Sequence, residues 1–86
     1  MFYVYLLKSQ KNGRIYTGYT SDLRQRFKEH NSGKSPYTKN LRPWKLIYYE
    51  AYFSEYDAKK RERSLKLRSN ASLQLRKRIE KSINEG

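Results

Sequence analysis

Cysteine is absent from this 86-residue sequence, which also has a single histidine and only eight acidic residues. Without cysteine there are no disulfides, no disulfide-linked partner, no thiol chemistry and no cysteine-based zinc finger. No apolar run is long enough to span a membrane, and no secretory signal is evident, so we expect a cytoplasmic protein. The remaining chemistry must come from tyrosine, basic side chains, the lone histidine and a few carboxylates.

Positive charge dominates what is present. Twenty Lys and Arg give a formal net charge of +12, whereas hydrophobic residues make up 36% of the chain. That composition allows one small domain, residues 1–86, with a modest core. A strongly basic surface favours a polyanionic partner, nucleic acid first and an anionic membrane surface second.

Aromatic and β-branched runs separated by turn residues and amphipathic stretches predict an α+β domain of order β-β-α-β-α-α. Strand 44–53 is apolar enough on both faces to be largely buried. Thr20 and Ser21 are candidate caps for the first helix, Gly33 its stop, and Ser54 with Asp57 the start of the second. The expected elements are strand 2–8, strand 14–20, a helix ending near residue 31, a loop 32–43, strand 44–53, helix 55–68 and a basic helix at about 71–84.

Strands 2–8 and 14–20 should pair as an antiparallel hairpin, because only a short turn joins them. Tyr5 and Tyr16 then lie on one face. A two-residue Asn12-Gly13 turn would keep their phenols apart, whereas a loop from Ser9 to Asn12 would place them directly opposite. On that face Gly18 should leave bare backbone that a ligand could approach. Nine tyrosines are present, so plain core packing is the alternative interpretation.

The first helix adds polar residues to an apolar stripe. Leu23 and Phe27 should face the sheet, which draws Arg26 and His30 toward it. An Arg and a His at this spacing can hold one anion between them. A lone histidine at such a position is more often structural, so both interpretations stay open.

The second helix places a carboxylate in its apolar stripe. Glu62 shares a face with Ala58 and Leu65, and a half-buried carboxylate needs a cationic partner, either Arg or a metal ion. One carboxylate with several waters is a common way to bind Mg²⁺ near phosphate. The other acids are scattered, which argues against a two-metal nuclease.

Taken together, these residues resemble the GIY-YIG endonuclease superfamily, in its small single-domain bacterial branch, over roughly residues 2–68. The first motif reads Tyr-Val-Tyr rather than Gly-Ile-Tyr, which keeps the hydroxyl. The segment 66–71 departs from the family pattern, and Asn70 and Asn84 are the only late asparagines. The matching residues are Tyr3-Val4-Tyr5, Tyr16-Thr17-Gly18, Asp22-Leu23, Arg26, His30-Asn31, Gly33-Lys34, Tyr37-Thr38, Pro43, Leu46, Tyr49-Glu50, Ala58 and Arg61-Glu62.

The resemblance implies a three-stranded antiparallel sheet flanked by helices and a nuclease that uses one Mg²⁺ or Mn²⁺ ion. It places the metal on Glu62 and the two motif tyrosines on Tyr5 and Tyr16. Tyr5 would orient or deprotonate the attacking water with the help of His30, and Arg26 would stabilise charge on the phosphate. Tyr16 would hydrogen-bond the phosphate or the water.

The expected partner is nucleic acid, DNA first, bound by a monomer or weak dimer. Two alternatives remain: a nucleic-acid-binding module of the same fold with little or no turnover, and a basic structural or ribosome-associated protein. The structural or ribosome-associated alternative predicts that the Tyr5 and Tyr16 phenols lie far from Arg26 and Glu62. Candidate nucleic-acid contacts are Gly18, Lys34, Tyr37, Lys39, Arg42, Lys59, Arg63 and Lys66.

Overall fold

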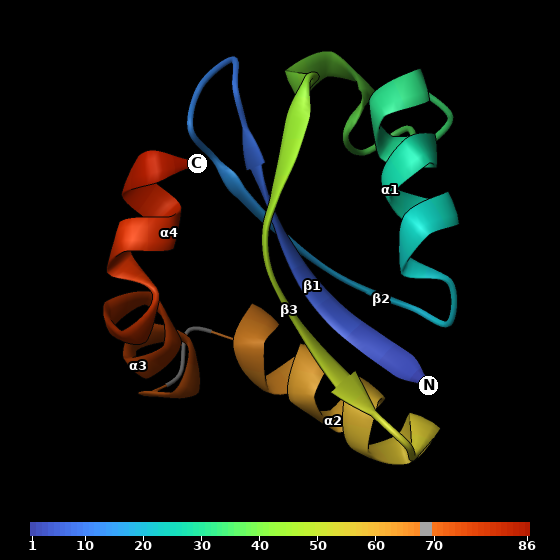
Figure 1. Ribbon diagram of the computed structural model, residues 1–86, viewed down its shortest axis with the longest axis vertical. Helices are drawn as coiled ribbons and strands as arrows, with labels where there is room; N and C mark the ends of the chain where they lie inside the picture. The colour runs from blue at the N-terminus through green and yellow to red at the C-terminus, as the bar shows by residue number, and fades with distance from the viewer. Residues whose placement is uncertain (68–69) are drawn as a thin grey trace.

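The computed structural model describes residues 1–67 and 70–86, and its element order confirms the predicted α+β arrangement (Figure 1). The predicted strands and the first two predicted helices are present, with boundaries shifted by one or two residues. A short 3-10 helix in the loop was not expected. The elements are β1 Phe2–Ser9, β2 Ile15–Thr20, α1 Leu23–Ser32, η1 Lys39–Leu41, β3 Trp44–Tyr52, α2 Glu55–Lys66, α3 Asn70–Arg78 and α4 Glu80–Glu85.

The three strands form one antiparallel sheet in the order β2-β1-β3. This order places β1 in the centre, which explains why Val4 to Leu7 and Ser9 are all buried. The expectation that residues 44–53 would be largely buried is wrong: β3 is an edge strand, and only Trp44 within it is buried. The apolar side chains of β3 pack on both faces of the sheet, but one edge of the strand has no neighbouring strand to cover it.

The β1–β2 register lies between the two that the sequence allowed. Tyr5 pairs with Gly18 and Leu7 with Tyr16, so neither the two-residue turn nor the Ser9–Asn12 loop is correct. The backbone N–H of Ser9 donates to the Arg14 carbonyl at 2.8 Å, which makes residues 10–13 the connecting loop. The Ser9 hydroxyl accepts from two loop amides and so fixes this length. Tyr5 and Tyr16 are therefore diagonal neighbours on one sheet face.

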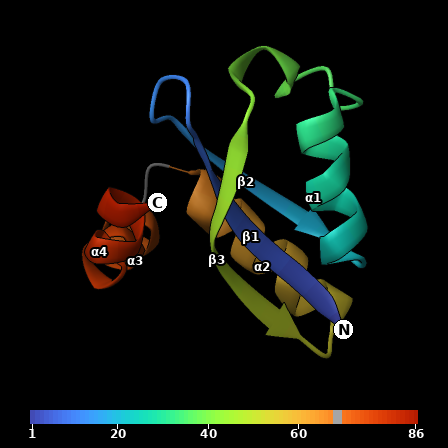
Figure 2. The same cartoon turned by 45° about the horizontal axis from the view of Figure 1, so that its top comes forward.

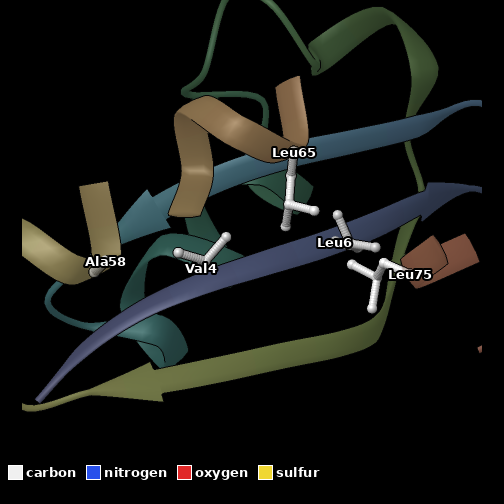
Figure 3. Close-up of a cluster of buried hydrophobic side chains, with 5 residues drawn as sticks. All are labelled: Val4, Leu6, Ala58, Leu65 and Leu75. Atoms are coloured by element: carbon white, nitrogen blue, oxygen red, sulfur yellow. The ribbon is translucent and has the colours of Figure 1, made fainter. Parts of the chain in front are cut away.

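The sheet separates two apolar clusters. On one face, Val4 and Leu6 of β1 pack with Ala58 and Leu65 of α2 and Leu75 of α3, as Figure 3 shows. On the other face, Tyr5, Leu7 and Trp44 form a second cluster, against which Leu23 and Phe27 of α1 pack. Successive side chains of β1 point to opposite faces of the sheet, so Val4 and Leu6 enter one cluster and Tyr5 and Leu7 enter the other. Figure 2 shows α1 and the α3–α4 pair on opposite sides of the strands.

Helix starts and stops follow local chemistry. Asp22, not Thr20 or Ser21, caps α1 by accepting from the Gln25 backbone N–H at 3.1 Å. Thr20 instead hydrogen-bonds the Asp22 backbone. Gly33 ends the helix with φ of 86°, as its position predicts, since a side chain is strained in this conformation.

The second helix also starts as its capping residues predict. The Ser54 hydroxyl accepts from the Asp57 N–H. This helix ends at Lys66, before the predicted limit at residue 68, which lies outside the described residues.

The C-terminal helix predicted at about 71–84 is two helices. Its regular pattern is interrupted at Ile79, whose φ of −110° and ψ of 28° are not helical. Leu75 is buried and Ile79 packs against the same cluster. Among the described residues, no helix combines the length and apolarity needed to cross a membrane.

Candidate active site

The centre of the site is a buried chain of hydrogen bonds that begins at Tyr5. Its phenol oxygen lies 2.8 Å from His30 Nε2. On the other side of the imidazole, Nδ1 lies 2.8 Å from the Thr38 hydroxyl. All three side chains are almost completely inaccessible to solvent, with exposed fractions of 1% or less. The sequence placed Tyr5 and His30 at one site, and the structure brings them into direct contact.

Gly18 makes room for the Tyr5 ring. A Cβ at position 18 would lie 2.3 Å from the Tyr5 ring and hydroxyl, so only glycine allows the ring to cross β2 at this point. Gly18 is itself buried. The expectation of exposed backbone at Gly18 is therefore wrong, because the Tyr5 ring covers the space through which a ligand would have approached.

Tyr16 closes one side of this arrangement. Its ring centroid lies 5.0 Å from that of His30 in an edge-to-face contact and 6.4 Å from that of Tyr5. It also packs at 6.2 Å from the Trp44 ring. Tyr16 is only half-buried, so its phenol can reach solvent while its ring fixes the imidazole.

Thr38 and its surroundings were not singled out as site residues. Trp44 Nε1 donates to the Thr38 carbonyl at 2.8 Å. The Asn31 side chain spans to β3, accepting from the Trp44 N–H at 2.6 Å and donating to its carbonyl. These bonds fix the end of α1 against the start of β3 and hold His30 in place. The sequence signals were the His30-Asn31 and Tyr37-Thr38 pairs, whose partners only the fold reveals.

Arg26 lies at the rim of the same pocket. Its guanidinium donates to Glu29 at 3.0 Å along the helix, and about a third of the side chain is exposed. Its charge also reaches the Tyr5 and Tyr16 phenols. Arg26 thus pairs with Glu29 along the helix and interacts electrostatically with both motif tyrosines.

Burial shifts both partners of the central hydrogen bond toward their neutral forms. Desolvation, assisted by Tyr16, raises the pKa of Tyr5 to about 12, and nearby Arg26 opposes the rise. Desolvation also lowers the pKa of His30 to about 4, with a further contribution from Arg26. Near pH 7 the pair is therefore a protonated phenol and a neutral imidazole.

Glu62 lies on α2, which covers the opposite sheet face from α1, yet its charge reaches Tyr5 and also Tyr19 of β2. Its side chain is 22% exposed and pairs with Lys66 at 3.1 Å. The expected cationic partner is thus a lysine rather than an arginine. Tyr5 thus interacts electrostatically with both Arg26 and Glu62.

The donor set at Glu62 suits a hard cation that keeps most of its water. Among residues 1–67 and 70–86, no three His, Cys, Asp or Glu side chains gather as a metal cluster. One partly buried carboxylate is still compatible with Mg²⁺, which commonly binds through one or two carboxylates plus substrate phosphate. A two-metal arrangement has no support in these residues.

A second carboxylate, Glu50 on β3, is committed to structure. Arg61 donates to both of its oxygens, at 2.9 and 3.0 Å, and the hydroxyls of Tyr48 and Tyr52 donate to it as well. This network lowers the pKa of Glu50 and fills its acceptor sites. The family resemblance places the metal on Glu62 and gives Glu50 no role.

Seven of the eight candidate nucleic-acid contacts are exposed, as such a role requires. Arg42 donates to the Lys39 carbonyl and lies against Gly33, so it stabilises the loop as well. Lys59 pairs with Glu55 at 3.6 Å and sits over the Tyr19 ring. Gly18 is the buried exception. The exposed residues are Lys34, Tyr37, Lys39, Arg42, Lys59, Arg63 and Lys66.

The comparisons with known proteins agree with this geometry. The model of the GIY-YIG catalytic domain matches residues 1–79. UPF0213 protein CPE1444 of Clostridium perfringens is 43% identical over 77 residues, covering 87% of this chain and 82% of that protein. UPF0213 protein SSP2268 of Staphylococcus saprophyticus is 42% identical over 65 residues, covering 74% of this chain and 78% of that protein.

A solved structure shares the fold. The solution NMR structure of UPF0213 protein BH0048 from Bacillus halodurans superposes with a TM-score of 0.54 at 36% sequence identity, covering 87% of this chain and 81% of that one. The three-stranded antiparallel sheet, its flanking helices and the motif residues at its centre lead to one assignment. This chain belongs to the GIY-YIG catalytic domain family, a family of nuclease type.

Proposed function

We propose that this protein is a metal-dependent nuclease that hydrolyses phosphodiester bonds, with DNA as the first substrate class. The observation that carries the proposal is the buried Tyr5–His30 hydrogen bond of 2.8 Å, whose phenol also interacts electrostatically with Arg26 and Glu62. A phenol bonded to a neutral imidazole, with a cation and a carboxylate within electrostatic range, suits a proton transfer beside a phosphate.

The proton path runs from water through Tyr5 to His30. We assign His30 Nε2 as the acceptor of the Tyr5 proton, which leaves the Nδ1–H to donate to the Thr38 hydroxyl. Tyr5 orients the attacking water and takes its proton as His30 receives the phenol proton. Thr38 holds the imidazole in the required tautomer.

The resting site does not complete this transfer by itself. The pKa of Tyr5 is about 12 and that of His30 is about 4, so the proton stays on the phenol. Additional positive charge beside Tyr5 is needed to bring the two values together. A divalent ion held by Glu62 would supply that charge, polarise the phosphate and stabilise the leaving oxygen.

Arg26 and Tyr16 act on the phosphate. The Arg26 guanidinium presents several N–H donors at the rim and stabilises negative charge that grows on the phosphate oxygens. Its ion pair with Glu29 sets its orientation. The Tyr16 hydroxyl, half-exposed beside the imidazole, donates a hydrogen bond to the phosphate or to the water.

The direct test compares nicking of supercoiled DNA by wild type and Glu62→Gln in Mg²⁺ and in Mn²⁺. Wild type should cleave, and Glu62→Gln should lose at least ~100-fold. Glu55→Gln is the matched control, because Glu55 lies on the same helix in a similar lysine pair, and it should cleave like wild type. Equal nicking by wild type and Glu62→Gln would identify the activity as a contaminant and reject the proposal.

A second candidate is a nucleic-acid-binding module with little turnover. Two observations favour it: the resting pair is fully neutral, and Lys66 already occupies the Glu62 carboxylate. Such a module would bind nucleic acid in a salt-dependent way that Glu62→Gln leaves unchanged, with no metal-dependent cleavage. The same panel of variants therefore separates the two functions.

A further inference from the structure

An open cavity of about 340 Å³ lies beside the candidate active site, at the outer edge of β2. Strand β2, the end of α2 and the start of α3 surround it. A second cavity of about 470 Å³, bounded by Tyr3, Asp22 and Tyr49 among others, includes none of the candidate catalytic residues. The smaller one includes Tyr16, so only this one of the two adjoins the chemistry. Its polar lining consists of Tyr16, Thr17, Lys66, Ser72 and Arg76.

This lining suits an anion. Lys66 and Arg76 bring two positive charges, and three hydroxyl side chains add donors. Strand β2 is an edge strand, so part of its backbone N–H groups point away from the sheet toward this side. The described carboxylates do not line the cavity. A phosphate group in such a place would meet donors on several sides.

Lys66 both pairs with Glu62 and lines the cavity. Its ammonium group lies 3.1 Å from Glu62, the candidate metal ligand, and its side chain also lines the cavity. Half of the lysine side chain is exposed, so a small rotation about its flexible stem can move the charge between the two. An exposed ion pair of this kind is weak and readily exchanged.

We propose that this cavity binds a backbone phosphate of the nucleic acid next to the one that is cleaved, and that Lys66 leaves Glu62 for that phosphate. The inference rests on the proposed function, since it takes Glu62 as the metal ligand. Lys66 thus neutralises Glu62 in the free protein and contacts the nucleic acid in the complex. Metal binding and nucleic-acid binding consequently favour each other.

The first test measures binding of a labelled single-stranded oligodeoxynucleotide in EDTA, where no cleavage can occur. Arg76→Gln should weaken binding roughly five-fold and reduce the dependence of log K on log salt by about 0.7, as expected for one lost phosphate contact. Arg78→Gln is the matched control: it removes the same charge two residues along α3, from a residue that lines a different cavity. Equal losses from the two variants would overturn the subsite.

The second test measures Mn²⁺ binding directly, from the electron paramagnetic resonance signal of the free ion. Lys66→Met should bind Mn²⁺ about two- to five-fold more tightly than wild type, because the competing ammonium is gone. Lys60→Met removes an exposed lysine of the same helix that is outside the candidate contacts, and it should bind Mn²⁺ like wild type. Unchanged Mn²⁺ affinity in Lys66→Met would overturn the exchange.

The coupling is tested by repeating the Mn²⁺ titration with the oligodeoxynucleotide or with inorganic phosphate. A non-hydrolysable backbone keeps the strand intact. The oligodeoxynucleotide should tighten Mn²⁺ binding in wild type but not in Lys66→Met, whereas an equal effect of inorganic phosphate would show a general anion site and overturn the nucleic-acid assignment. None of these readouts depends on turnover. Failure of the nuclease proposal would appear in the nicking assay, and failure of this one in the binding assays.

Discussion

Gly18 lies directly opposite Tyr5 across the β1–β2 ladder, and the Tyr5 ring occupies the volume that a side chain at position 18 would need. This close approach allows the Tyr5 phenol to reach His30 from the central strand. Gly18, the glycine of the second motif, therefore provides the space for Tyr5, the tyrosine of the first motif.

Replacing Gly18 by alanine should displace Tyr5 and lengthen its bond to His30. We expect a loss of about 1–3 kcal/mol in the free energy of unfolding, because the inserted methyl overpacks a buried contact. Cleavage should fall with it, and urea denaturation together with the nicking assay would show both. Gly13→Ala is the control: position 13 has open space but φ of 78°, so it should cost about 1 kcal/mol through backbone strain alone. A Gly18→Ala variant with full activity would contradict this view of the site.

Tyr5→Phe removes one hydroxyl from the buried chain and leaves His30 Nε2 without its partner. An unsatisfied buried polar atom costs about 1–3 kcal/mol, so unfolding by urea should occur at a lower concentration. Cleavage should fall by ~100-fold or more, since the proton path is broken. Tyr56→Phe, at a 74% exposed position outside the candidate contacts, should change neither. Activity within a few-fold of wild type in Tyr5→Phe would remove Tyr5 from the mechanism.

Stability should depend on the protonation of His30 at mildly acidic pH. The folded protein holds this group near pKa 4, whereas an unfolded histidine titrates near its ordinary value of 6.5. The unfolded chain therefore binds a proton first, and stability that is present above pH 6.5 is lost as the pH falls toward 4. The shift corresponds to about 3 kcal/mol for a fully buried imidazole.

The measurement is the free energy of unfolding between pH 4.5 and 7 for wild type and His30→Gln. Because the chain has one histidine, the slope in this window should be steeper for wild type. Glu50, Glu55 and Glu29 have lowered pKa values, so their losses begin at more acidic pH. Parallel curves for the two proteins would mean that His30 is not buried in its neutral form.

Glu50 and Glu62 should respond in opposite ways to substitution. Arg61→Met leaves Glu50 half-buried without its bidentate partner and should lower stability by about 1–3 kcal/mol. Activity per folded molecule should stay near that of wild type, since neither residue reaches the Tyr5–His30 pair. Glu62→Gln should show the reverse pattern, with little loss of stability because the lysine of its single ion pair is half exposed. Urea denaturation and nicking of the same samples would separate the two carboxylates.

Local chemistry explains why much of the fold was predictable. Aromatic and β-branched runs specify strands, and the Gly33 and Ser54 termini follow from backbone conformation and hydrogen bonding within a few residues. The break at Ile79 and the strand order were not predictable. Both depend on what the chain packs against, and the sequence of one strand does not show whether its edge will be paired.

The hairpin shows where local information ends. Turn residues allowed a tight turn or a longer loop, but the observed register pairs Tyr5 with Gly18 and matches neither. Packing of the Tyr5 ring over Gly18 and the Ser9 hydroxyl bonds to the loop select it. These contacts depend on how the side chains fit together in the folded protein, so the turn residues alone could not predict the register.

The sequence by itself determined the chemical inventory: a basic, cysteine-free domain with the tyrosines, Arg26, His30 and Glu62 at the spacing of the GIY-YIG family. Only the tertiary structure decided which of these groups meet. It bonded Tyr5 to His30 and His30 to Thr38, paired Glu62 with Lys66, and committed Glu50 to Arg61. The physical reason is that residue types fix which interactions are possible, whereas burial, charge proximity and hydrogen-bond partners depend on distances that arise only when remote segments pack.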